Sequence, residues 1–288
     1  MASNNYKIIV AVLVVVIIAG GIFGYSAVNR GKTAARKVVD VELPMEQAVR
    51  EVEVSVWETA NAIFYYMVEP SAISLEEYKK QLKDVENFMA KYNALVDTEQ
   101  EKQIVAKFQN MWTDSVTKAE ELIKLRDKMK ELHEKTWNAV HDADDVIDYK
   151  VQVAFVEGLP DLIKKEKAVR EMEAGIWEVI GATNYYIHRQ FDKPQRAYSK
   201  HLEELSEFWG TYKGLNITPA EKPFLEEFDN KWNLSVKLMN ECHSLADELK
   251  QKYLAFWESV HAADDVIDFE IQEYLKKRIE SRMTRLTQ

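Results

Sequence analysis

A cluster of one histidine and three aspartates occurs twice in the sequence with identical spacing. The first copy comprises His141, Asp144, Asp145 and Asp148, and the second comprises His261, Asp264, Asp265 and Asp268. Steps of three and four residues place each set on one face of a helix. Carboxylates and imidazole bind metal ions, and carboxylates also bind ammonium groups. One interpretation is therefore a site between helices for a metal ion or an amine-bearing ligand.

The alternative interpretation is a structural network in which two arginines neutralise these aspartates. The chain is expected to reverse at Gly158, so residues at equal distances from this turn lie at the same height. This places Arg170 within reach of Asp145 or Asp148.

The repeat places Arg50 in the same way beside Asp265 and Asp268. Buried carboxylates paired with arginines would fix the register between a long and a short helix. We favour this structural interpretation, because both copies preserve the cluster whereas a ligand site would need only one.

Two adjacent tyrosines also recur, with Tyr65 and Tyr66 corresponding to Tyr185 and Tyr186. They can line a small-molecule pocket near the ends of short helices. Aromatic residues at this spacing more often belong to the core of a bundle, and both interpretations stay open.

Five basic residues stand near the end of the sequence: Lys276, Lys277, Arg278, Arg282 and Arg285. Next to anionic lipid each would gain ~1 kcal/mol, which predicts a membrane-surface patch. The alternative is a solvated helix end, where cations are favourable without a membrane.

Motifs of common catalytic and cofactor sites are missing. The sequence has no Cys-x-x-Cys-His, no glycine-rich phosphate loop and no nucleophile elbow. It has a single Glu-x-x-His, formed by Glu258 and His261, whereas a carboxylate-bridged di-iron bundle needs this motif on two helices. We therefore expect no enzymatic activity, no cofactor and no metal. The net charge of −10 argues against nucleic-acid binding, which requires a basic surface.

The composition predicts an all-α protein, because only nine Gly and six Pro interrupt long stretches of helix-forming residues. Apolar residues recur in steps of three and four, as in bundle helices. Pro44 suits a first helical turn, and capping-box spacings at Ser74 and Thr98 predict the starts of the second and third helices. A further long helix is expected to open at Thr218-Pro219.

The soluble part is a duplication, since residues 48–152 align without gaps on residues 168–272. Each copy has two short helices and one helix too long for its partners, so each long helix must also pack against the other copy. We expect two stacked four-helix bundles that share long helices. The expected segments are an anchor at 1–30, repeat 1 at 31–157 and repeat 2 at 158–288.

Residues 8–25 form an uninterrupted apolar run, long enough to cross ~30 Å of hydrocarbon as a helix. It predicts a transmembrane anchor rather than a cleaved signal peptide, whose apolar core is shorter. Basic residues after the run, from Arg30 to Lys37, would on their own keep the large domain in the cytoplasm.

Several of these motifs together resemble the extracytoplasmic helical sensor region of bacterial chemoreceptors and sensor histidine kinases, particularly the helical bimodular type. The matching features are the single amino-terminal span, the Leu43-Pro44 and Leu159-Pro160 entries, the AVRE-type first helix with Tyr-Tyr near its end, and the long DDVID helix. The resemblance covers about residues 5–285. It implies a single-pass protein of the plasma membrane whose helical domain is extracytoplasmic, against the charge signal.

Such receptors continue into a second span and a cytoplasmic signalling module, neither of which precedes Gln288. The expected function is therefore a sensory or ligand-binding module that acts through a partner protein. The alternative is an architectural subunit of a membrane-attached envelope complex. The expected partners are membrane lipid at residues 8–25, a second copy or another envelope protein, and a small-molecule ligand.

Overall fold

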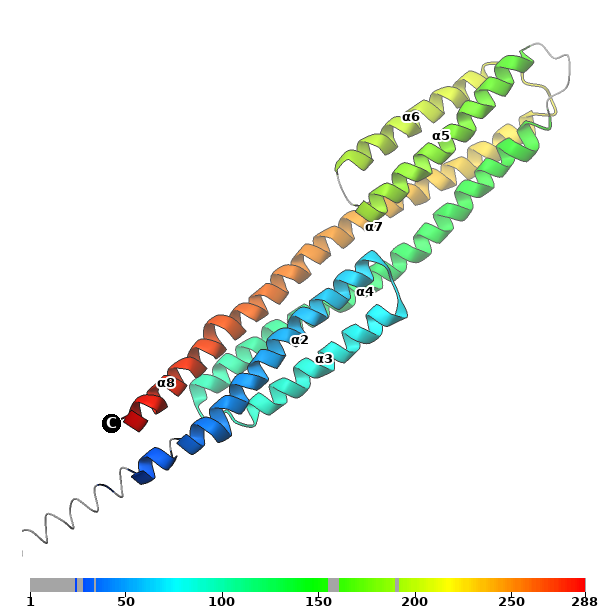
Figure 1. The fold of residues 1–288 in the computed structure, drawn as a ribbon. Helices are drawn as coiled ribbons and strands as arrows, with labels where there is room; N and C mark the ends of the chain where they lie inside the picture. Colours follow the sequence, from blue (N-terminus) through cyan, green and yellow to red (C-terminus); the bar gives the residue numbers. More distant parts are fainter. Residues whose placement is uncertain (1–23, 25–27, 34, 155–160, 190–191, 288) are drawn as a thin grey trace, which may run out of the picture. The chain divides into compact units, whose positions relative to one another are not determined.

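The computed structural model describes residues 24, 28–33, 35–154, 161–189 and 192–287. Every regular element within these ranges is a helix, as the composition predicts (Figure 1). In chain order they are η1 (Val38–Glu42), α2 (Leu43–Val68), α3 (Ala72–Asn93), α4 (Glu99–Val146), η2 (Ile147–Val151), α5 (Leu162–Arg189), α6 (Asp192–Lys213), α7 (Lys222–Val266), η3 (Ile267–Gln272) and α8 (Glu273–Thr287). The η elements are short π-helical segments.

The predicted anchor at residues 8–25 lies outside the described residues, apart from Gly24. Within the described part of the chain, no helix combines the length and the apolar character that a membrane crossing requires. The anchor therefore stays a prediction.

Capping side chains set the starts of both long helices. The backbone N–H of Glu101 donates to Thr98 Oγ1 at 3.2 Å, which confirms the capping box predicted before α4. The N–H of Glu221 donates to Thr218 Oγ1 at 3.3 Å in the same way before α7. The start predicted at Ser74 is late, because α3 already begins at Ala72.

The described helices form two compact units, and each unit contains segments from both copies of the repeat. Unit 1 comprises Met1–Ile63, Ala72–Ser115 and Glu258–Gln288. Its core is built from apolar side chains of α2, α3, α4, η3 and α8, including Val52, Ile63, Val85, Phe108, Ile271 and Leu275. Hydrogen bonds also join these helices, for example between the hydroxyls of Thr98 and Tyr274 at 2.9 Å.

Unit 2 comprises Phe64–Ser71 and Val116–Trp257. Helices α5 and α6 lie side by side in this unit (Figure 1). Its core joins α4, η2, α5, α6 and α7 through buried residues that include Val140, Ile147, Met172, Ile176, Leu205, Phe228 and Met239. Apolar burial of this kind is the main favourable term in folding.

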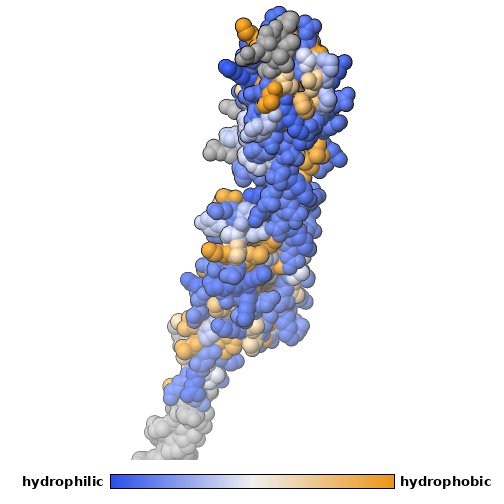
Figure 2. Space-filling model, turned by 90° about the vertical axis from the view of Figure 1, so that its right-hand side faces the viewer, coloured by the Kyte–Doolittle hydropathy of each residue, from blue (hydrophilic) through white to orange (hydrophobic). Residues whose placement is uncertain are grey.

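On the face drawn in Figure 2, hydrophobic residues appear in scattered groups among hydrophilic ones.

A buried ion pair lies at the start of α7 in unit 2. The ammonium of Lys165 is 2.8 Å from both carboxylate oxygens of Glu221, and neither side chain is exposed (0% each). The hydroxyl of Tyr212 donates to the same carboxylate at 2.8 Å. The pair is stable only as a unit, because either charge alone would be buried without compensation.

Lys165→Met should lower the free energy of unfolding by about 3–5 kcal/mol, because it leaves the Glu221 carboxylate buried and unpaired. The double variant Lys165→Met/Glu221→Gln should recover part of this loss. Denaturant unfolding followed by circular dichroism measures both effects.

The matched control is Lys164→Met, since the neighbouring Lys164 is exposed and its ion pair, with Asp161, lies at the surface. A similar loss of stability in both single variants would contradict the special role of Lys165.

Candidate functional site

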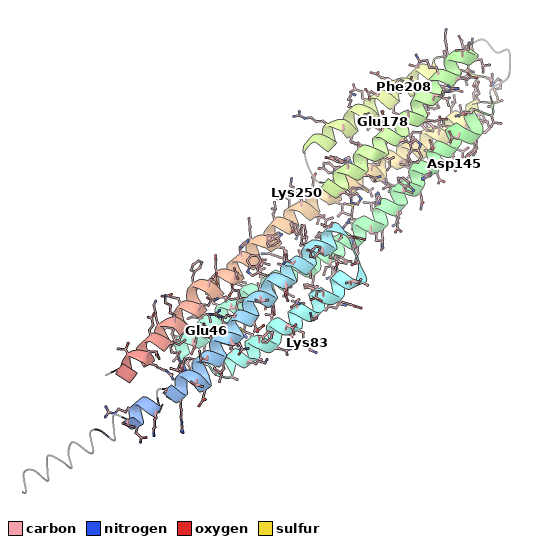
Figure 3. All side chains as sticks on the ribbon, in the orientation of Figure 1. Glu46, Lys83, Asp145, Glu178, Phe208 and Lys250 are labelled. Carbon is pink, nitrogen blue, oxygen red and sulfur yellow. The ribbon has the colours of Figure 1, made fainter. Side chains whose placement is uncertain are left out.

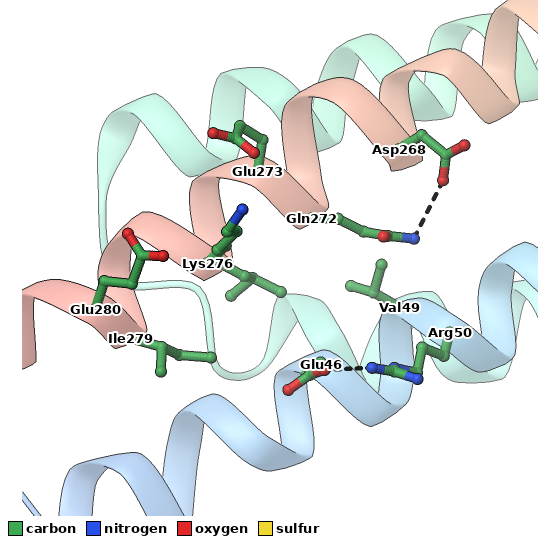
Figure 4. A pocket seen from close by; sticks show the side chains of 10 residues that line it. Glu46, Val49, Arg50, Asp268, Gln272, Glu273, Lys276, Ile279 and Glu280 are labelled. Atoms are coloured by element: carbon green, nitrogen blue, oxygen red, sulfur yellow. Dashed lines mark hydrogen bonds and ion pairs between the residues drawn. The ribbon is translucent and has the colours of Figure 1, made fainter. Parts of the chain in front are cut away.

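A cavity of about 330 Å³ lies in unit 1 between α2 and the segment formed by η3 and α8 (Figure 4). Its lining consists of Glu46, Val49 and Arg50 from α2, and of Asp268, Gln272, Glu273, Leu275, Lys276, Ile279 and Glu280 from the other wall. The volume is within the range of small-molecule sites in proteins.

The lining of this cavity combines apolar and charged side chains. Val49 and Leu275 are buried members of the lining, which also contains carboxylates and cations. The amide of Gln272 donates to Asp268 at 3.2 Å and to Glu53 of α2 at 2.8 Å, which joins the two walls. Four carboxylates line the cavity against two cations, so its net charge is negative.

The predicted pairing of Arg50 with Asp265 and Asp268 is wrong, because the guanidinium contacts another carboxylate. Arg50 and Asp268 do line the same cavity, but the guanidinium pairs with Glu46 at 2.6 Å and is 72% exposed. Glu46 lies one helical turn before Arg50 on the same helix, so the two side chains can pair without any contribution from a second helix. Asp265 is exposed and does not line the cavity.

Next to the cavity, Asp264 is held by a tryptophan rather than by an arginine. Trp57 Nε1 donates to Asp264 Oδ1 at 3.1 Å, and the rings of Trp57 and His261 meet edge to face at 5.1 Å. Burial, together with the charges of Asp268 and Glu53, raises the pKa of Asp264 to about 6. The recurrence of Trp57 as Trp177 is the sequence signal that could have identified this partner.

The equivalent cluster of unit 2 repeats this arrangement. Asp144 is only 7% exposed and accepts a hydrogen bond from Trp177, while the rings of Trp137, His141 and Trp177 pack edge to face at 5.0–5.8 Å. Burial and the neighbouring charge of Asp148 raise the pKa of Asp144 to about 6.

A carboxyl pair completes the cluster of unit 2. Glu173 of α5 shares a hydrogen bond with Asp148 and accepts another from Gln152. Burial and the Asp148 contact raise the pKa of Glu173 to about 7. Among the ion pairs of the described residues, none joins Arg170 to Asp145 or Asp148, so the predicted arginine network is not formed here either. Glu173 takes the position facing Asp148, and Arg170 is exposed.

The two members of each tyrosine pair lie in different environments. Tyr66 and Tyr186 are buried and donate to Asp127 and Asp247, respectively, in unit 2. Their neighbours Tyr65 and Tyr185 are 62% and 45% exposed. Adjacent residues on a helix point in different directions, so one member of each pair is a core residue, while the pocket interpretation stays a prediction.

The basic residues near the end of the sequence divide between two environments. The guanidinium of Arg278 is largely buried and contacts Glu42, Asp97 and Glu101, and Arg282 contacts Glu42. These two arginines therefore neutralise buried acids, which contradicts their assignment to a membrane surface. Lys277 pairs with Glu273 and Lys276 lines the cavity, while the side chain of Arg285 lies outside the described residues.

Comparison with protein families identifies the bundle. Residues 5–154, just over half of the 288, match the model of a four helix bundle sensory module for signal transduction. The chain belongs to this family. The match agrees with the resemblance to receptor sensor regions, and the sensory module family includes the apolar run at residues 8–25 in its matched range. A search of curated proteins returns no match.

Asp144→Asn should stabilise the sensory module at high pH. The pKa of Asp144 is about 6 in the folded chain and near 3.9 in an unfolded one, so the stability cost of ionisation grows as the pH rises from about 4 to about 6 and is fully present above pH 6. The variant should raise the free energy of unfolding by about 1–3 kcal/mol near pH 8 and change it little near pH 4.

Denaturant unfolding at the two pH values measures this difference. Asp145→Asn is the matched control, because the adjacent Asp145 is exposed. A gain that is equal at both pH values, or equal in the control, would contradict the assignment.

Proposed function

We propose that this chain is a membrane-anchored sensory module whose helical domain lies outside the cytoplasm and signals through a partner protein. The family match carries the sensory role, and its matched range includes the apolar run expected to form the anchor. The receptor sensor regions that this sequence resembles hold their ligand-binding helices outside the membrane. In this proposal the two bundles stack end to end, with α8 returning toward the anchor.

The proposed ligand site is the cavity of unit 1, and the proposed ligand carries an ammonium group. Glu46 already neutralises Arg50 and Lys277 pairs with Glu273, which leaves Asp268 and Glu280 with Lys276 as the remaining charged lining. The excess of carboxylates favours a cation, and an ammonium can donate hydrogen bonds to several carboxylates at once. The apolar lining residues Val49, Leu275 and Ile279 suit a short alkyl chain.

In this proposal, ligand binding in the cavity acts on the helix that follows the anchor in the chain. One wall belongs to α2, which follows η1 and the segment after the apolar run, and the other belongs to η3 and α8. A ligand that contacts both walls favours whichever relative position of α2 and α8 gives it better contacts. The π-helical turn in η3 is a local departure from α-helical pairing of the kind often found at functional sites.

Binding should raise the melting temperature of the purified chain, since a ligand of the folded state stabilises it by about 2.7 kcal/mol at one hundred times its Kd. We expect short mono- and diamines to shift the melting temperature, and Asp268→Asn to require about tenfold more amine for the same shift. Asp265→Asn, at the exposed neighbouring position, should behave like the unmodified chain.

A shift caused by dicarboxylic acids but not by amines would contradict the proposed ligand class. The absence of a shift with amines, amino acids and organic acids would contradict ligand sensing in this cavity. If no ligand shifts the melting temperature and the chain is recovered from native membranes only inside a large assembly, these two results together would favour the architectural alternative.

The anchor and its orientation are tested in cells. A reporter enzyme active only outside the cytoplasm, fused after Gln288, should be active, and the chain should resist carbonate extraction from membranes. Deletion of residues 1–30 should release it. Activity of a cytoplasm-specific reporter at the same fusion point would overturn the proposed orientation.

A further inference from the structure

Three side chains of α5 and α6 converge on one point of unit 2, away from the cavity described above. Glu178 comes from α5, where Figure 3 labels it, and His201 and Glu204 come from α6. One ligand atom from each residue lies within 4.8 Å of the others. His201 Nδ1 is 3.1 Å from Glu178 Oε2 and 3.2 Å from Glu204 Oε2.

Close packing of α5 against α6 brings these side chains together. A Cβ atom added to Gly175 would lie 3.1 Å from Leu205 Cδ1, so the glycine allows a closer approach than alanine would. Gly175 and Glu178 are one turn apart on α5, as are His201 and Leu205 on α6. The imidazole is 24% exposed, which leaves the site open to solvent on one side.

Carboxylates outnumber lysine and arginine side chains at this point of the structure. Two carboxylates face the same imidazole nitrogen, and Lys200 contacts only the other oxygen of Glu204, Oε1, at 3.2 Å. The second oxygen of Glu204, Oε2, remains directed to His201.

The donor set and its spacing fit zinc. Zinc binds imidazole nitrogen at about 2.0–2.1 Å and carboxylate oxygen at about 2.0–2.2 Å in tetrahedral geometry, which separates neighbouring donors by about 3.3–3.5 Å. The separations of 3.1 and 3.2 Å around His201 Nδ1 need only a small expansion to reach these values. We propose that Glu178, His201 and Glu204 bind a zinc ion, with water as the fourth ligand.

Only the second copy of the repeat carries this donor set. The equivalent residues of the first copy are Glu58, Gln81 and Asp84, so a glutamine stands where the imidazole is. Gln81 is buried and donates to Glu77 at 2.6 Å. The bound ion would hold α5 and α6 together in unit 2 and is independent of an amine in the cavity of unit 1.

The test is zinc titration of the full chain without an affinity tag, by competition with a chromophoric chelator. One zinc ion per chain should bind, and affinity should fall as the pH is lowered because protons compete for the ligands. His201→Gln, which installs the residue of the first copy, should weaken binding by about 100-fold or more, since even the loss of an outer partner costs 10–100-fold.

Glu203→Gln is the matched control, because Glu203 is exposed beside Glu204 and is not part of the donor set, so zinc affinity should be unchanged. Glu178→Gln provides a second variant if His201→Gln alters the circular dichroism spectrum. Zinc should also raise the melting temperature of the unmodified chain but not of His201→Gln. The proposal is overturned by no binding, or by equal affinity in the unmodified chain and both site variants.

Discussion

The structure depends on keeping a carboxylate charged where no water reaches it. Glu101 at the start of α4 and Glu221 at the start of α7 are both buried, each accepting a hydrogen bond from a tyrosine and from a capping threonine or a cation. Burial alone would raise the pKa of Glu221, but hydrogen bonds from Lys165 and Thr218 lower it. A buried charge tolerates only a narrow range of partner positions, so each glutamate fixes where its long helix begins against its neighbours.

The two copies meet this requirement with different cations. Lys165 of α5 serves Glu221 in unit 2, whereas Met45 occupies the equivalent position of α2 and Arg278 of α8 serves Glu101 in unit 1. The guanidinium of Arg278 also contacts Glu42, so it joins α8 to the segment that precedes α2. Duplication therefore preserved the helices and the acid, and the source of the positive charge became specific to each unit.

The helical class, the repeat and the start of α4 could all be predicted from sequence, because they follow from local composition and from Thr98 and Glu101. The partners of the repeated aspartates could not. An arginine on the facing helix looked suitable for Asp268, but Glu46 lies nearer to Arg50 along its own helix. The actual partner of Asp264, Trp57, depends on which way an indole turns after packing. His201 with Glu204 has a readable spacing, yet Glu178 joins them only because α5 and α6 pack closely at Gly175.

Both aspartate clusters contain more negative charge than the described side chains neutralise. Asp264 and Asp144 each have a pKa near 6 because burial and neighbouring carboxylates oppose ionisation, and hydrogen bonds from Trp57 and Trp177 only partly offset this. An uncompensated acid of this kind lowers the stability of the empty state, so any cation that approaches it is bound more favourably. In unit 1 a cation in the proposed ligand site would lie beside Asp268, whose charge is one cause of the raised pKa of Asp264. The same electrostatic excess that makes the cluster costly to fold therefore supports the proposal that the sensory module responds to a positively charged ligand.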